Sequence, residues 1–168
     1  MGPAPGVVEV HVPPRALGTV LYDALGGAAA ALGALAVMAA ASVLGGGALA
    51  AGPNAIGAWM VRWLQSAAPD AVHRAYWDAT VGGVVTSAVA GGVVGALFGA
   101  TTTRWRAGNL PLVGVAVGLA CWAVVRWVVA PALDPLLVRV FDWRALLLAG
   151  VAFGALLGYW ARIGRDAL

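Results

Sequence analysis

The chain has 168 residues, of which 62% are apolar and only 10% are charged, and its mean hydropathy is +0.90. Soluble domains are typically about 45–50% apolar and about 25% charged, so this composition excludes a water-soluble globular domain. The net charge of +3 comes with no basic run, zinc pattern or stacking platform, and nucleic acid is therefore not an expected partner.

Four long stretches of the chain carry no charged residue, and the charges gather in the gaps between them. An ionised side chain inside lipid is costly, and about 20 apolar residues cross the hydrocarbon core as a helix. We therefore predict an all-α, polytopic membrane protein with about four transmembrane helices in contact with the lipid bilayer. The spans are expected at about residues 20–45, 78–103, 110–129 and 143–160.

Residues 1–16 are expected to form a short extended head, and residues 17–168 a single transmembrane domain. The first uncharged stretch, residues 24–61, would be about 57 Å long as one helix, well beyond the hydrocarbon thickness of about 30 Å. Gly45-Gly46-Gly47 and Gly52-Pro53 are natural break points. We predict a second, short apolar helix at about residues 54–65, which lies at the interface or re-enters the membrane.

The third span is predicted to end soon after Arg126. Pro131 and Pro135 should close it and start a short interfacial helix at about residues 134–140. Tryptophans at span ends and interfacial pieces are typical of the aromatic belt at a membrane surface. The tryptophans at such predicted positions are Trp63, Trp77, Trp105, Trp127, Trp143 and Trp160.

An arginine–aspartate pattern occurs twice along the chain. Arg62, Asp70 and Asp78 recur with the same spacing as Arg126, Asp134 and Asp142. The pattern predicts two helix hairpins that run parallel, related by an axis along the membrane normal. These six residues and His73 form a candidate interfacial polar site. The favoured interpretation is that the aspartates cap helix starts and the arginines suit helix ends, and the alternative is a binding vestibule.

Small residues recur every fourth position in three of the predicted spans. Such stripes let helix backbones approach closely in lipid, so they are expected to pack the spans together or against another subunit. The residues concerned are Gly83, Ser87, Gly91, Gly95, Gly99, Gly114, Gly118, Gly150, Gly154 and Gly158.

The sequence offers little reactive chemistry. No Asp, Glu, Lys or His is expected deep in a span, and no phosphate loop, nucleophile elbow or HExxH motif is present. The single cysteine, Cys121, lies in an apolar segment and is expected to be a packing residue. We therefore predict no enzyme activity, no cofactor and no metal site.

From Ala71 to Trp160 the order of features resembles the YagU-like uncharacterised bacterial inner-membrane proteins. The residues that carry the resemblance are His73, Tyr76, Gly82-Gly83, Gly91, Gly95, Gly99, Pro111, Gly114, Gly118-Leu119, Trp122 and Pro131. A second histidine of that pattern is replaced here by the Phe141-Asp142-Trp143 segment, which argues against a paired-histidine site. The resemblance implies a small multi-span inner-membrane protein and no defined activity.

The leading functional hypothesis is a structural or accessory membrane protein that forms a homo-oligomer or part of a larger membrane complex. The alternative is a small transporter or channel-like protein. The expected location is the bacterial inner membrane. Both termini are expected to be cytoplasmic because the arginines of that side are clustered, although each side carries five arginines.

Overall fold

The computed structural model describes residues 17–47, 49–60, 77–133 and 142–166. Every regular element in these ranges is helical. The main helices are α1 (Leu17–Leu44), α2 (Ala51–Met60), α3 (Trp77–Thr101), α4 (Leu110–Val124) and α7 (Trp143–Asp166). A 3₁₀ turn, Ala107–Asn109, precedes α4, and a π-helical turn, Val125–Val129, joins α4 to α5 (Ala130–Leu133). The predicted all-α fold is confirmed.

Four helices are long and apolar enough to cross a membrane. They cover Leu17–Leu44, Trp77–Thr101, Ala107–Ala132 and Trp143–Asp166. The lengths of 24 to 28 residues correspond to about 36–42 Å of helix, sufficient for a layer of about 30 Å. The protein is therefore a multi-pass membrane protein, as the uncharged stretches predicted.

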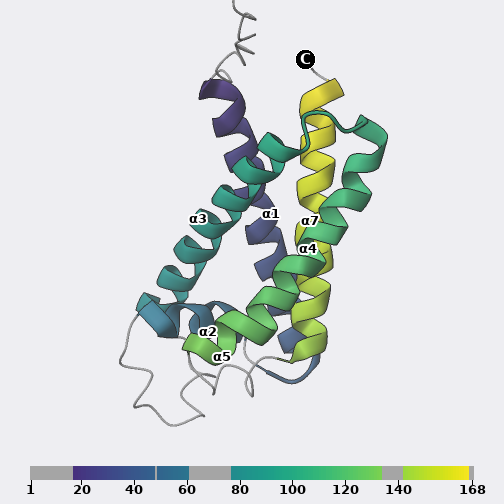
Figure 1. The fold of residues 1–168 in the computed structure, drawn as a ribbon. Coiled ribbons are helices and arrows are strands. Elements are labelled where there is room, and N and C mark those ends of the chain that lie inside the picture. Colours follow the sequence, from purple (N-terminus) through teal and green to yellow (C-terminus); the bar gives the residue numbers. More distant parts are fainter. Residues whose placement is uncertain (1–16, 48, 61–76, 134–141, 167–168) are drawn as a thin grey trace, which may run out of the picture.

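The four spans lie in the lateral order α3, α1, α7, α4. The extensive contacts join α1 to α3, α1 to α7, and α4 to α7, whereas α2 packs against α3. Figure 1 shows that neighbouring spans are antiparallel, and that the start of α1 and the end of α7 lie at the same end as the α3–α4 connection. We call this end the terminal end; α2 and α5 lie at the opposite end.

The two helix hairpins, α1 with α3 and α4 with α7, run parallel to each other in Figure 1. A two-fold axis along the membrane normal would convert the α1–α7 contact into an equivalent α3–α4 contact. Among the described helices, α3 and α4 make no contact of comparable extent. The shared direction of the hairpins follows the predicted arrangement, while the internal duplication itself stays a prediction.

Backbone contact at glycines holds each hairpin together. A Cβ atom added to Gly95 of α3 would lie 2.7 Å from Gly27 Cα of α1. One added to Gly118 of α4 would lie 2.8 Å from the backbone nitrogen of Gly154 in α7. Because these separations are too short for real Cβ atoms, the two pairs of helices meet without intervening side chains. Van der Waals packing of this kind is a main source of helix association in lipid.

The glycine stripes lie mainly inside the single chain. Gly91 and Gly95 face α1, Gly99 faces Asp23 of α1, and Gly83 faces Pro53 and Gly57 of α2. Gly114, Gly118, Gly150, Gly154 and Gly158 lie at the α4–α7 contact. The backbone of α2 thus approaches the first turns of α3 as closely as the spans approach each other.

The third span extends beyond its predicted end, and Pro131 lies inside a helix. The chain continues from α4 through the π-helical turn into α5, and the Ala130 N–H donates to the carbonyl of Val125. In an ordinary α-helix a proline ring clashes with the carbonyl four residues earlier and removes one hydrogen bond. The wider π-helical turn shifts the hydrogen-bond register before the proline. The helix therefore continues past its predicted end at Val129 and reaches Leu133.

The close approach at Gly95 yields a stability prediction. Gly95→Ala should reduce the stability of the folded protein by about 1–3 kcal/mol, the usual cost of overpacking, because backbone atoms cannot yield to the new methyl group. Gly92→Ala is the matched control, since its Cβ would meet only the Ala24 carbonyl oxygen at an ordinary 3.4 Å. Thermal unfolding in detergent measures both variants, and equal midpoints for the two would contradict the predicted contact.

Candidate functional site

The predicted interfacial polar site is only partly described by the structure. Arg62, Asp70, His73 and Asp134 lie outside the described residues, as does the predicted helix at 134–140. Asp78 is exposed in the first turn of α3, and Asp142 is exposed just before α7. Arg126 lies half-buried in the π-helical turn. Within the described ranges these last three residues form no ion pair with one another, so no shared site arises from them there.

Asp142 caps the start of α7. Its Oδ1 accepts a hydrogen bond from the Arg144 backbone N–H at 3.0 Å, which is the predicted N-cap arrangement. Asp78 differs because it is the second residue of α3 rather than the residue before it. Its negative charge still suits the positive end of the helix dipole. Arg126 is also placed differently from expectation, because the helix continues past it to Leu133.

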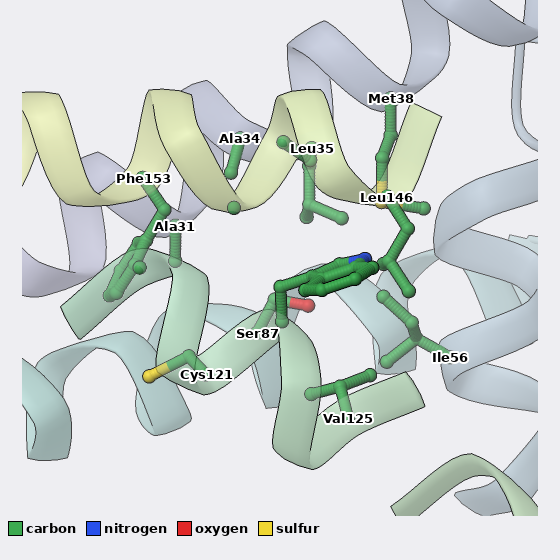
Figure 2. Close-up of a pocket in the computed structure, with 14 residues that line it drawn as sticks. Ala31, Ala34, Leu35, Met38, Ile56, Ser87, Cys121, Val125, Leu146 and Phe153 are labelled. Carbon is green, nitrogen blue, oxygen red and sulfur yellow. The ribbon is translucent and has the colours of Figure 1, made fainter. Parts of the chain in front are cut away.

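An apolar cavity of about 170 Å³ lies where all four spans and α2 meet. Figure 2 shows Ala31 and Phe153 at one end of it, and Met38, Ile56 and Leu146 at the other. The fourteen lining residues include no charged side chain, and their few polar groups are the Ser87 hydroxyl, the Cys121 thiol and the Trp122 indole. Ser87, Gly118 and Gly150 are the members of the predicted small-residue stripes that line this space.

The indole of Trp122, one of the lining residues, carries a polar atom without a partner. Its indole nitrogen, Nε1, is buried and has no hydrogen-bond partner in the described structure. The indole ring packs edge-on against Trp127, with ring centroids 5.0 Å apart. A buried donor without an acceptor costs about 1–3 kcal/mol relative to a satisfied one, and in lipid no bulk water is present to supply the bond.

A second, polar pocket of about 220 Å³ lies at the terminal end of the bundle. Its polar lining comes from the start of α1, the residues after α3 and the end of α7; the side chains concerned are those of Thr19, Tyr22, Asp23, Thr102, Thr103 and Arg165. Because α1 begins at Leu17, Asp23 lies within the first span, one and a half turns from its start. Asp23 is thus an ionisable residue inside the first span, on the side of the terminal end.

Arg165 ties the loop after α3 to α7. Its guanidinium donates to the backbone carbonyls of Thr102 and Trp105, and to the Thr102 hydroxyl at 3.2 Å. Thr102 is itself buried, with its hydroxyl donating to the Phe98 carbonyl at 2.6 Å. The Thr102 carbonyl also accepts the Trp105 backbone N–H at 3.0 Å, so the guanidinium adds a second, charged donor there and joins this loop to α7.

A buried polar pair joins α2 to α3 at the opposite end. Asn54 is 1% exposed, and its Oδ1 accepts a hydrogen bond from the Thr80 hydroxyl. The short helix therefore packs through Asn54 and Gly57 against the first turns of α3. These contacts explain why α2, which contains two glycines and a proline, forms a separate helix packed on α3 rather than an extension of α1.

The residues that organise these two spaces were not predicted from the sequence. Trp122 was named only within the family resemblance, and Asp23 and Arg165 were not singled out. Arg165 sits in the last turn of a helix, a general signal for carbonyl contacts, but its partners are about 60 residues away in sequence. In the described residues no group of three or more His, Cys, Asp or Glu side chains could hold a metal ion.

Comparison of the chain with protein-family models, with curated protein sequences and with solved structures found no match.

The contacts of Arg165 predict a specific loss of stability. Arg165→Ala should destabilise the fold by about 1.5–3 kcal/mol, the usual contribution of hydrogen bonds to a charged group, because the bonds from the guanidinium to the Thr102 and Trp105 carbonyls are lost. Arg162→Ala, one turn earlier, is the control, since Arg162 makes only an exposed pair with Asp166 at 3.6 Å. Thermal unfolding in detergent should separate the two variants, and an Arg162 effect as large as that of Arg165 would refute the assignment.

Proposed function

We propose that this chain is a non-enzymatic integral membrane protein that acts by association within the bilayer, as a homo-oligomer or as an accessory subunit of a larger complex. The bacterial inner membrane, suggested by the resemblance to the YagU-like proteins, is the proposed location. The start of α1 and the end of α7 share one end of the bundle (Figure 1), which supports termini on one side, and we propose that this side is cytoplasmic.

The observation that carries the proposal is the outer face of the third span. Only 11% of the residues in its most apolar window are buried within the chain, against 33% for the fourth span. On this face Ala116 and Ala120 are exposed and four residues apart, which is the spacing that lets helices approach closely in lipid. The glycine stripes of α3 and α7 are already occupied within the chain, so this uncovered face of α4 is the better candidate for a contact with another subunit.

The proposal predicts the mass of the purified particle. In a mild detergent, native mass measurement should give a multiple of 16.8 kDa or a complex with a second membrane protein. Ala116→Ile/Ala120→Ile should weaken that association roughly five- to 150-fold, corresponding to about 1–3 kcal/mol of overpacking. These side chains face outward, so the variant should keep the stability of the single chain.

Ala36→Ile/Ala40→Ile provides the matched control. These two alanines have the same spacing and are also exposed, but they lie on α1. The control should keep the mass of the unaltered protein. A strictly monomeric unaltered protein with no co-purifying subunit would contradict the proposed function.

A small transporter or channel-like protein is the second candidate. The observation that favours it is Asp23, an ionisable group inside the first span that lines the polar pocket at the terminal end. Ionisable groups within spans commonly mark substrate or ion pathways. Cysteines introduced one at a time along α3 would be tested with a water-soluble thiol reagent in a Cys121→Ala background.

A labelled stripe that reaches from Gly99 toward Ser87 would favour a pathway. Labelling confined to the two ends of α3 would reject it, and this is the outcome that the close packing of α3 on α1 predicts.

A further inference from the structure

We infer that the terminal end of the bundle binds the headgroup of an anionic phospholipid through arginines on the α3–α4 connection and at the end of α7. This interaction is separate from the proposed contact with another subunit and does not depend on it. The arginines concerned, which we call the arginine cluster, are Arg104, Arg106, Arg162 and Arg165.

Charge is divided unequally between the two ends of the described bundle. At the terminal end the described residues include the four arginines of the cluster but only two acidic residues, Asp23 and Asp166. At the opposite end two arginines are matched by two aspartates; these residues are Arg126, Arg144, Asp78 and Asp142. The excess positive charge of the described residues therefore lies at the terminal end, where it attracts anions.

The α3–α4 connection carries the arginines that are most accessible to a ligand. Arg104 and Arg106 are both exposed, and neither forms an ion pair with another described residue. On α7, Arg162 pairs with Asp166 at 3.6 Å, and the guanidinium of Arg165 is engaged with backbone carbonyls. Arg104 and Arg106 are therefore the proposed contact residues, and the two arginines of α7 add positive charge beside them.

Hydrogen bonds hold this connection in place before any ligand binds. The Trp105 backbone N–H donates to the Thr102 carbonyl at 3.0 Å, and the Arg165 guanidinium donates to the carbonyls of both residues. Arg104 and Arg106 flank Trp105 in the chain. A backbone that is already fixed lowers the ordering cost of binding, so these two arginines are presented to a headgroup without first folding a loop.

The depth of the connection in the membrane favours a lipid over a soluble anion. The second span ends at Thr101, so the residues that follow lie at the level of the headgroups. Trp105, between the two arginines, is 51% exposed, and an exposed indole favours the membrane–water interface. The planar guanidinium matches phosphate oxygens with parallel donors. An anionic phospholipid provides a phosphate, a net negative charge and an apolar region at this one depth.

Two lipids with the same acyl chains test the inference. Dioleoylphosphatidylglycerol is anionic and dioleoylphosphatidylcholine is zwitterionic, although both contain a phosphate. The full chain, purified in a mild detergent, would be titrated with each lipid, and native mass measurement would count bound lipids and protein subunits separately. We expect phosphatidylglycerol to bind roughly five- to thirtyfold more tightly, about fivefold for each contacting arginine. This preference should shrink as ionic strength rises.

A charge-neutralised pair of positions assigns the preference to the arginine cluster. Arg104→Gln/Arg106→Gln should remove most of the preference and leave the affinity for phosphatidylcholine nearly unchanged. Arg126→Gln/Arg144→Gln is the matched control, because it removes the same charge at the opposite end, and it should keep the preference. Arg104→Gln and Arg144→Gln alone repeat the comparison at two exposed positions. Thermal unfolding in detergent would show that each variant is folded.

Four results would overturn the inference. Equal affinity for the two lipids in the unaltered protein would show that the terminal end does not select an anionic headgroup. An undiminished preference in Arg104→Gln/Arg106→Gln would show that the α3–α4 connection is not the site. An equal loss in the control would show that the net charge of the chain, rather than the cluster, attracts the lipid. Displacement of phosphatidylglycerol by an equal concentration of glycerol 3-phosphate would show a site for soluble phosphates.

Discussion

Direct backbone contact at glycines is the interaction on which the rest of this structure depends. In water, apolar side chains drive helices together, but in a bilayer the surrounding lipid tails are equally apolar and that driving force is absent. Close packing must therefore supply the attraction. Gly27 against Gly95, and Gly118 against Gly154, remove the side chains that would otherwise hold the helices apart. In each hairpin the two helices consequently touch over a surface that only glycine residues can form.

The same constraint explains where the central cavity lies. Gly118 and Gly150 belong both to the α4–α7 contact and to the cavity lining. Beyond them, toward α2, the side chains of Trp122, Met38 and Leu146 take the place of glycines. These larger groups separate the helices by more than a backbone contact, and their irregular shapes do not fill the space. The cavity thus lies where direct backbone contacts at glycines give way to contacts between large side chains.

Much of the architecture could be predicted from the sequence because lipid imposes a simple rule on charge. The four uncharged stretches predicted four spans, and Asp142 before an apolar run predicted an N-cap. Both predictions need only the residues of one short segment of the chain at a time. The continuation of the helix past Pro131 was not predicted, because it depends on a π-helical turn that shifts the hydrogen-bond register upstream. The contacts of Arg165 with Thr102 and Trp105 were not predicted either, because they depend on how distant segments fold together.

Trp160 and Trp122 differ in whether the indole nitrogen has a hydrogen-bond partner. Trp160 was expected at the membrane surface as part of the aromatic belt. Its Nε1 donates to the Tyr22 carbonyl of α1 at 3.2 Å, and the centroids of the two rings lie 5.2 Å apart. The indole therefore joins α7 to α1 while keeping its polar atom satisfied, as buried tryptophans usually do.

Trp122 Nε1 is buried and has no acceptor in the described structure. A helical carbonyl can accept a second bond, as that of Tyr22 does from Trp160, but none lies within hydrogen-bond distance of Trp122 Nε1, and the bilayer interior offers no water. A phenylalanine would fill the same space without that cost. The unpartnered indole of Trp122 is therefore unfavourable for the stability of the described fold, whereas the partnered indole of Trp160 contributes to it.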